Sequence, residues 1–213
     1  MSETGSLLQT KLFMPPFRRF NVLRSHLVEK LNDRLWQDGR FLRPLTLISA
    51  PAGFGKTSVV VEWLYNDRLV GIPIAWLSLD EADNDPARFA AYWLAALQQV
   101  APALGVGLLS GLPTPLNSLQ PLVTQVLNQL ATLPQYLLLV LDDFHLIQNE
   151  LGQTAVALFI EHLPPNAHVV LTSREDPPLP LPRLRARGQI VELRQRDLQF
   201  SPAETAVFLR QTL

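Results

Sequence analysis

The 213-residue chain carries a formal net charge of −1, and 47% of its residues are hydrophobic. This length suffices for one sizeable core, and the balanced charge gives no electrostatic argument for nucleic-acid binding. The absence of cysteine excludes disulfides and thiolate metal sites. No apolar run approaches the ~20 residues that span a bilayer, and the N-terminus lacks the features of a secretory signal. We therefore expect a soluble cytoplasmic protein with no membrane partner.

In the first half of the chain a strand, a glycine-bearing turn and a helix follow one another directly. Residues 1–22 are expected to be irregular, and leucines at helical spacing predict an amphipathic helix over residues 24–37. An apolar strand at 45–49 runs into the turn. A second helix is predicted from Lys56 to about Tyr65.

The turn has the composition of a phosphate-binding loop. Gly53 and Gly55 permit positive φ, so that the backbone can pass close to an anion and point several N–H groups at it. Lys56 adds a positive charge, and Thr57 offers a hydroxyl to Mg²⁺. The consensus loop begins with glycine where this chain has Ala50, so a chance glycine turn before an ordinary helix stays an alternative. The predicted nucleotide-binding residues of the loop are Pro51, Ala52, Gly53, Phe54, Gly55, Lys56, Thr57 and Ser58.

A second informative stretch, YLLLVLDD at residues 136–143, is an apolar run that ends in two carboxylates. Such a run is typical of a strand buried on both faces of a parallel sheet. Strand-like and helix-like segments alternate through the rest of the chain. Strands are predicted at 74–78, 168–174 and 190–193, helices at 86–100, 118–130 and 153–163, loops at 101–117 and 177–182, and a helix start at 201–204.

This alternation predicts an α/β fold with a parallel sheet. Right-handed crossovers would bring the strand ends at Ala50, Asp80, Asp142 and Ser173 to one edge. Ligands of such sheets bind outside the carboxyl ends of the strands. The phosphate loop and the paired carboxylates are therefore expected in one crevice.

The residues of this crevice suggest a division of roles in nucleotide hydrolysis. Lys56 would contact the β- and γ-phosphates. Thr57 and Asp142 would hold Mg²⁺, which keeps much of its hydration shell in proteins. Asp143 would orient or deprotonate the attacking water. The alternative for the carboxylates is a solvated strand end without function.

Arg174 and His145 are further candidates. Arg174 ends the strand at 168–174 and is predicted to contact the γ-phosphate, which makes it a catalytic candidate together with Asp143 and Lys56. Its alternative is a surface pair with Asp176 or Glu175. His145 would lie at the same site or be a histidine satisfied locally after its strand.

Five segments of the chain together cover most of residues 10–207. They are TKLFMPP…NVLRSHLVEKL, LISAPAGFGKTSVVVEW, AWLSLDEADNDPARFAAYWLAAL, LLLVLDDFHLI and VVLTSREDPPLPLPRLRARGQIVEL…LQFSPAE. They resemble the nucleotide-binding module of STAND-class ATPases, specifically the MalT-like large ATP-binding regulators of the LuxR family. In this family the loop has the sequence Pro-Ala-Gly-x-Gly-Lys-Thr preceded by alanine or serine, and Asp-Asp-Phe-His is also typical of it.

The resemblance implies a three-layer P-loop NTPase fold with a mostly parallel five-stranded sheet. This sheet is of the additional-strand, AAA+-like type, in which another strand separates the loop strand from the carboxylate strand. The implied ligands are ATP or ADP and Mg²⁺, with Arg24 and the residues just before it near the adenine and ribose. The implied domains are an N-terminal extension (1–23), a P-loop nucleotide-binding domain (24–193) and the start of a following helical domain (194–213).

The resemblance also implies a function. Family members switch between an ADP-bound resting form and an ATP-bound form that self-associates, and further helical, winged-helix, sensor and DNA-binding domains follow this module. The chain is thus expected to be the N-terminal part of a signal-responsive transcriptional regulator. It would hydrolyse ATP slowly as a switch, and DNA binding would belong to the other domains.

Two other functions stay open on the residues alone. One is a small P-loop phosphotransferase, for which Arg183, Arg185 and Arg187 would supply a lid. The other is a nucleotide-binding scaffold that never hydrolyses its ligand. Without the family resemblance, nothing in the sequence distinguishes ATP from GTP.

Overall fold

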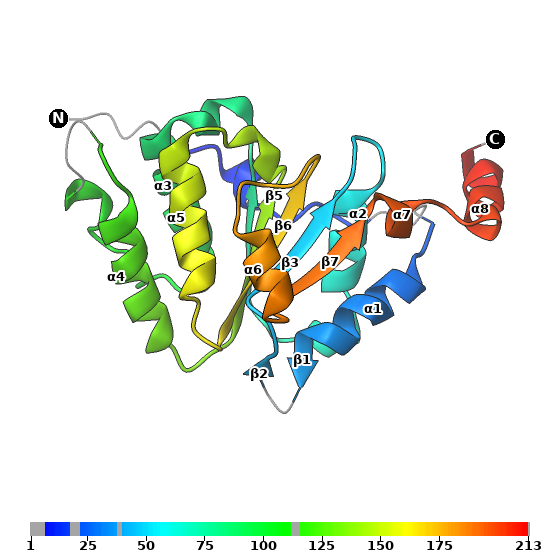
Figure 1. Cartoon of the computed structure of the whole chain (residues 1–213), viewed down its shortest axis with the longest axis horizontal. Coiled ribbons are helices and arrows are strands. Elements are labelled where there is room, and N and C mark those ends of the chain that lie inside the picture. Colours follow the sequence, from blue (N-terminus) through cyan, green and yellow to red (C-terminus); the bar gives the residue numbers. More distant parts are fainter. Residues whose placement is uncertain (1–6, 18–21, 38–39, 112–115, 213) are drawn as a thin grey trace.

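The computed structural model describes residues 7–17, 22–37, 40–111 and 116–212. Its centre is a five-stranded parallel sheet in the order β4-β5-β6-β3-β7, covered by helices (Figure 1). The predicted α/β fold is confirmed, and so is the additional strand, because β6 lies between the loop strand β3 and the carboxylate strand β5. The strands are β3 (Leu45–Ser49), β4 (Ile74–Ser78), β5 (Leu137–Asp142), β6 (Ala167–Ser173) and β7 (Ile190–Arg194).

The strands end together at one edge of the sheet, as expected. Ser49 pairs with Ser173, and Ser78 pairs with Asp142, so the carboxyl ends of β3, β6, β4 and β5 are in register. Every residue of β3, β5 and β6 is buried, because helices cover both faces. The loop after β3 and the carboxylates at the end of β5 therefore meet above the same edge.

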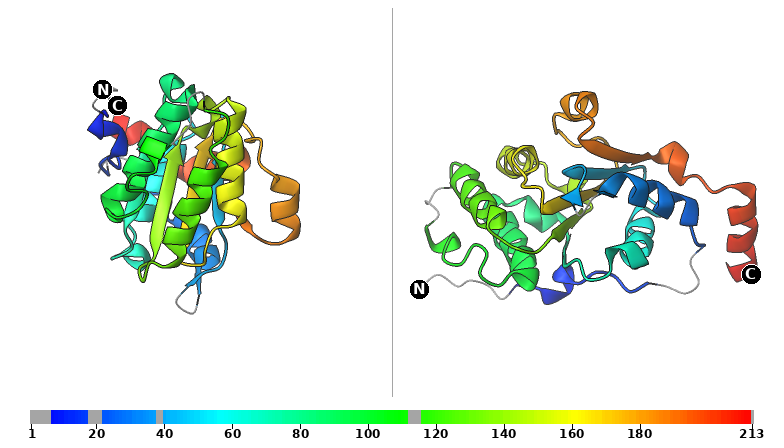
Figure 2. Two further views of the ribbon diagram at one scale, coloured as in Figure 1. Left: turned by 90° about the vertical axis from the view of Figure 1, so that its left-hand side faces the viewer. Right: turned by 90° about the horizontal axis from the view of Figure 1, so that it is seen from below.

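Helices lie on both faces of the sheet (Figure 2), and each face carries a hydrophobic core. Fully buried Trp63 belongs to the core beneath α1 and α2, and fully buried Trp93 to the core beneath the helices of the other face. Alternate strand residues point to each core. The first face carries α1 (Ser25–Leu35) and α2 (Lys56–Leu64), the second carries α3 (Pro86–Val100), α4 (Gln120–Ala131), α5 (Glu150–Glu161) and α6 (Leu181–Ala186), and α7 (Gln195–Leu198) and α8 (Pro202–Thr212) follow β7.

Most predicted boundaries differ from the structure by one or two residues, and three differences have a clear local cause. The first helix ends at Leu35 because the next residues form an antiparallel pair of short strands, β1 (Trp36–Gln37) and β2 (Arg40–Phe41). There the Trp36 ring packs edge-on against the rings of Phe41 and Tyr136, with distances of 5.0 and 4.7 Å between ring centres. The fifth helix begins at Glu150, since the Asn149 side chain caps it by accepting the Gly152 N–H at 2.6 Å. In the proline-rich segment, α6 forms because Pro182 falls in its first turn, where no backbone donor is lost.

Part of the predicted N-terminal extension, residues 1–6 and 18–21, lies outside the described residues, as do 112–115 of the predicted loop. The described remainder includes a 3-10 turn at Gln9–Leu12 that brings Lys11 into a buried ion pair with Asp83. The Lys11 ammonium also lies 3.0 Å from Asp80 and 4.3 Å from the centre of the Tyr92 ring. This segment is therefore anchored to the acidic turn at the end of β4. Within the described part of the chain, no helix is long and apolar enough to cross a membrane.

Candidate nucleotide site

The loop after β3 folds as the glycines require. Gly53 and Gly55 have φ of 82° and 74°, in the region that favours glycine. Gly55 is the N-cap of α2, and no side chain caps this helix. The N–H groups of the first turn of α2 thus remain available, and with the helix dipole they form a site for an anion.

Lys56 is the first residue of α2 and is buried, with 7% of its surface exposed. Its ammonium donates to the Pro51 carbonyl at 3.2 Å, which curls the side chain back over the loop. Burial lowers the pKa of Lys56; nearby Asp143 opposes this shift and Arg174 adds to it. An anion bound in the loop would offset the poor solvation of this cation.

The Asp142 carboxylate lies at the end of β5 between two hydroxyl groups. Thr172 Oγ1 donates to its Oδ1 at 2.6 Å, and Thr57 Oγ1 lies 3.0 and 3.1 Å from its two oxygens. Burial raises the pKa of Asp142, and Asp143 adds to the shift, while the hydrogen bonds from Thr172 and Thr57 oppose it. A desolvated carboxylate beside a threonine hydroxyl is the oxygen donor set that suits Mg²⁺, so these residues fit the predicted metal.

Asp143 adopts a left-handed backbone conformation, with φ of 59°. No other non-glycine residue among those described has a positive φ. Its N–H donates to Thr172 Oγ1 at 2.8 Å, so one threonine side chain contacts both acidic residues. Aspartate tolerates this backbone conformation better than most residues do. The Asp143 side chain is 40% exposed at the edge of the sheet where the strands end.

Arg174 follows β6 and is exposed. Among the described residues it has no hydrogen bond or ion pair, and the alternative pairing with Asp176 is wrong because Asp176 binds Arg194 and Arg185. Its charge nonetheless acts on Lys56, which places it within electrostatic reach of the loop. The guanidinium is thus available to a ligand in the crevice.

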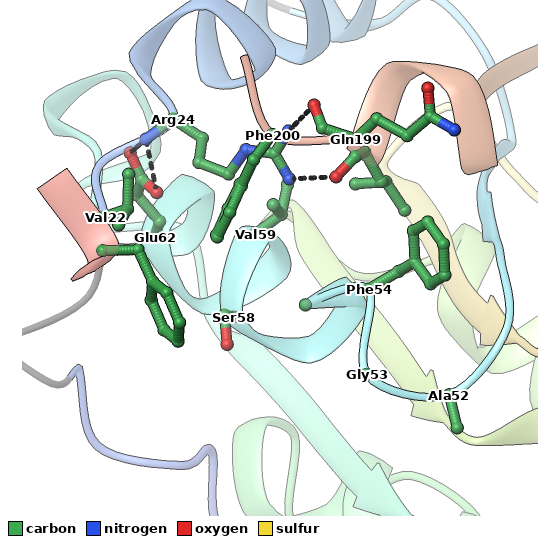
Figure 3. A pocket seen from close by; sticks show the side chains of 13 residues that line it. Val22, Arg24, Ala52, Gly53, Phe54, Ser58, Val59, Glu62, Gln199 and Phe200 are labelled. Carbon is green, nitrogen blue, oxygen red and sulfur yellow. Dashed lines mark hydrogen bonds between the residues drawn. The ribbon is translucent and has the colours of Figure 1, made fainter. Parts of the chain in front are cut away.

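A cavity of about 730 Å³ adjoins the loop (Figure 3). Its walls come from the loop and α2, from the segment before α1, from the end of α7 and the residues that follow it, and from α8. The cavity is mostly apolar, with a few polar groups, as small-molecule sites are. The lining residues are Val22, Arg24, Ala52, Gly53, Phe54, Gly55, Ser58, Val59, Glu62, Leu198, Gln199, Phe200 and Phe208.

Arg24 lies in the cavity wall, with 4% of its surface exposed, and connects two distant parts of the chain. Its guanidinium donates to the carbonyls of Leu198, at 2.9 Å, and of Asp197 and Gln199, both at 3.2 Å (Figure 3 draws part of this network). Its backbone N–H donates to the Glu62 carboxylate at 2.8 and 3.0 Å. Arg24, which is predicted to contact nucleotide, thus holds the C-terminal end of α7 and the residue after it.

Several residues of the site are not predicted from the sequence. Glu62, Phe200 and Phe208 reach the cavity from elements whose local pattern carries no sign of a ligand. Thr172 could have been found from the sequence, though only weakly, because it is a polar residue within the apolar run of β6. By contrast, Arg183 and Arg185 are not brought to the crevice, because they pair with Glu161 on α5 and with Glu192 on β7.

Comparisons with known proteins confirm the resemblance found in the sequence. The chain is 35% identical over 203 residues to the HTH-type transcriptional regulator MalT of Cronobacter sakazakii and 36% identical over 207 residues to MalT of Serratia proteamaculans. Each alignment covers 95% of this chain and 21% of the relative, so the chain spans about a fifth of the length of these regulators. No family model matches the chain.

Solved structures with a similar arrangement are more distant. AMPPCP-bound DnaA from Aquifex aeolicus is 15% identical, with a TM-score of 0.46 over 94% of this chain and 55% of that one. A chain of the Drosophila ORC bound to AT-rich DNA and Cdc6 is also 15% identical, with a TM-score of 0.49 over 85% of this chain and 56% of that one.

Proposed function

Since the homologues of this chain are MalT HTH-type transcriptional regulators, we propose that it is the nucleotide-binding switch module of such a regulator. In this proposal it binds ATP and ADP with Mg²⁺ and hydrolyses ATP slowly. One observation carries it: a glycine loop and a helix N-terminus meet the paired carboxylates at one sheet edge, with Thr57 Oγ1 3.0 Å from Asp142 Oδ1.

The loop binds the phosphates of the nucleotide. Its backbone N–H groups face the anion, and Lys56 contributes the charge. Each charge-assisted contact contributes roughly 1.5–3 kcal/mol, so three or four account for the ~8 kcal/mol of micromolar binding. The binding residues in this proposal are Arg24, Pro51, Ala52, Gly53, Phe54, Gly55, Lys56, Thr57 and Ser58.

Thr57 and Asp142 would hold Mg²⁺, which neutralises charge on phosphate oxygens. Asp143, which follows β5 in a left-handed backbone conformation, orients or deprotonates the attacking water. Arg174 contacts the γ-phosphate and reports its loss. The absence of a hydrogen bond or ion pair to Arg174 among the described residues supports this role.

The adjoining cavity takes the base and ribose. Its aromatic residues Phe54, Phe200 and Phe208 offer ring faces to a flat base. Arg24 lines this cavity and also binds the carbonyls of residues 197–199. A ligand in the cavity would therefore affect the position of α7 and of α8, which follows it. We assign residues 24–193 to the nucleotide-binding domain and 194–213 to the start of a following helical domain.

The same proposal places the chain within a cytoplasmic regulator. Self-association in the ATP form, and DNA binding through other domains, would be properties of the whole protein. The phosphotransferase alternative is disfavoured, because Arg183 and Arg185 are engaged in ion pairs with Glu161 and Glu192 instead of forming a lid.

Phosphate release from Mg·ATP, with and without added alcohol and carboxylate acceptors, tests this function. We expect slow release, in the range of unassisted nucleotide switches at roughly 10⁻⁴ s⁻¹, that does not depend on any acceptor. Transfer only when an acceptor is present would establish a phosphotransferase. Binding of ATP with no release at all would establish a scaffold.

A further inference from the structure

His145 is a histidine whose two ring nitrogens are buried and to which the mechanism proposed above gives no role. It lies in the short 3-10 turn Phe144–Leu146 directly after the paired carboxylates, and 10% of its side chain is exposed. Neither ring nitrogen has a hydrogen-bond partner among the described residues. Leaving a polar group unpaired in such a place destabilises the fold, and native structures contain few such groups.

The nearest carboxylate oxygen belongs to Asp143. The distance from His145 Nδ1 to Asp143 Oδ1 is 3.8 Å, about 1 Å longer than a charge-assisted hydrogen bond. The two groups differ in freedom, since the His145 side chain is 10% exposed whereas the Asp143 side chain is 40% exposed. If the contact closes, we expect the Asp143 side chain to move rather than the ring.

The backbone around the ring is held in place. The Leu146 N–H donates to the Asp143 carbonyl at 3.1 Å, and the Ile147 N–H donates to the Phe144 carbonyl at 3.0 Å. Phe144 and Ile147 are both buried, with 1% of their surfaces exposed. The turn thus presents the imidazole at a fixed position beside a carboxylate whose backbone is also fixed, by the hydrogen bond to Thr172.

Burial of the ring favours its neutral form. Burial lowers the pKa of His145, Asp143 and Glu175 oppose the shift, and Arg174 and Lys56 add to it. A neutral imidazole has one N–H donor and one acceptor nitrogen, and the donor is set by its strongest partner. Beside a carboxylate, that partner favours the proton on Nδ1.

We propose that His145 is a positioning residue for Asp143: its Nδ1–H donates to Asp143 Oδ1 and leaves Oδ2 directed at the attacking water. This inference rests on the hydrolysis proposed above. It assigns His145 no contact with nucleotide and no proton transfer. A base held by such a partner is oriented before the reaction, and loss of an orienting partner typically lowers activity about 10- to 100-fold.

The imidazole tautomer tests this contact without requiring hydrolysis. Long-range proton–nitrogen spectra of the ¹⁵N-labelled chain, without nucleotide and with Mg·ADP, identify the protonated nitrogen. The His145 signals are assigned by their loss in His145→Phe, since the chain has only four histidines. We expect the Nδ1–H form, with a change in the Nδ1 signal in Asp143→Ala. An Nε2–H form, or a signal that Asp143→Ala leaves unchanged, would overturn the inference.

Steady-state phosphate release tests the role in catalysis. His145→Phe keeps a ring of similar size without nitrogen, and His145→Asn keeps a donor near the Nδ1 position. We expect kcat to fall about 10-fold or more in His145→Phe with KM unchanged, and to recover in large part in His145→Asn. Unchanged kcat in His145→Phe, or equal losses in both variants with equal melting temperatures, would show a merely structural histidine. If the unaltered chain releases no phosphate, the proposed hydrolysis fails, while the tautomer still decides the contact with Asp143.

Discussion

Replacing Lys56 by alanine is expected to abolish nucleotide binding. The variant loses the ammonium that lies over the loop, at 3.2 Å from the Pro51 carbonyl. A charged contact of up to about 3 kcal/mol corresponds to a loss of about 100-fold in affinity, so that no binding is expected at the micromolar concentrations that saturate the unaltered chain. Isothermal titration of the variant with Mg·ADP and Mg·ATP measures this loss.

The ligand-free Lys56→Ala chain should fold normally. The substitution removes a buried ammonium with a lowered pKa, and alanine is a good helix former for the first turn of α2. Arg68→Ala is a matched control, because it removes one exposed positive charge after the far end of α2. Ordinary affinity in Lys56→Ala, with Arg68→Ala also unchanged, would refute the assignment of the loop.

Asp143→Asn is expected to keep nucleotide binding and to lose hydrolysis, by about 100-fold or more in kcat. Asparagine adopts the left-handed conformation at φ of 59° as readily as aspartate, and its N–H can still donate to Thr172 Oγ1. The amide, however, cannot accept a proton from water. Single-turnover phosphate release separates this loss from any change in affinity.

The control for Asp143→Asn is Glu175→Gln, which neutralises an exposed carboxylate that acts on the same crevice. It should leave turnover within about twofold of the unaltered chain. If Asp143→Asn turns over at the normal rate, Asp143 is not the base. Loss of affinity in Asp143→Asn would instead mean that this carboxylate contributes to binding the ligand.

The parallel sheet was predictable because its strands are continuous apolar runs. Segments such as 137–142 are buried on both faces, and this pattern has few other structural solutions. The handedness of the crossovers predicts that the carboxyl ends of the strands lie at one edge of the sheet. The contact between Thr57 and Asp142 follows from this arrangement.

The β1–β2 pair and α6 are not predicted from the sequence, and the reason in each case is local. The helical spacing of leucines continues up to Leu35, where packing of Trp36 against Phe41 and Tyr136 ends the helix. In the segment that forms α6, prolines are frequent, and only the position of Pro182 in the first turn makes a helix compatible with them.

The cavity walls could not be predicted, because they depend on contacts between distant segments. Arg24 reaches the carbonyls of residues 197–199, which brings Phe200 to its guanidinium at 5.2 Å. No periodicity or motif connects these parts of the chain. The family resemblance pointed to Arg24, but to a ligand contact rather than to this network.

The most direct test of the account is a nitrogen–proton NMR titration of the chain with Mg·ADP. The account predicts saturable shifts of the amides of Gly53, Gly55 and Lys56, together with those of Arg24 and Phe200 across the cavity. Shifts confined to other surfaces, or an unmoved loop at millimolar ADP, would contradict the central claim that this loop and cavity bind nucleotide.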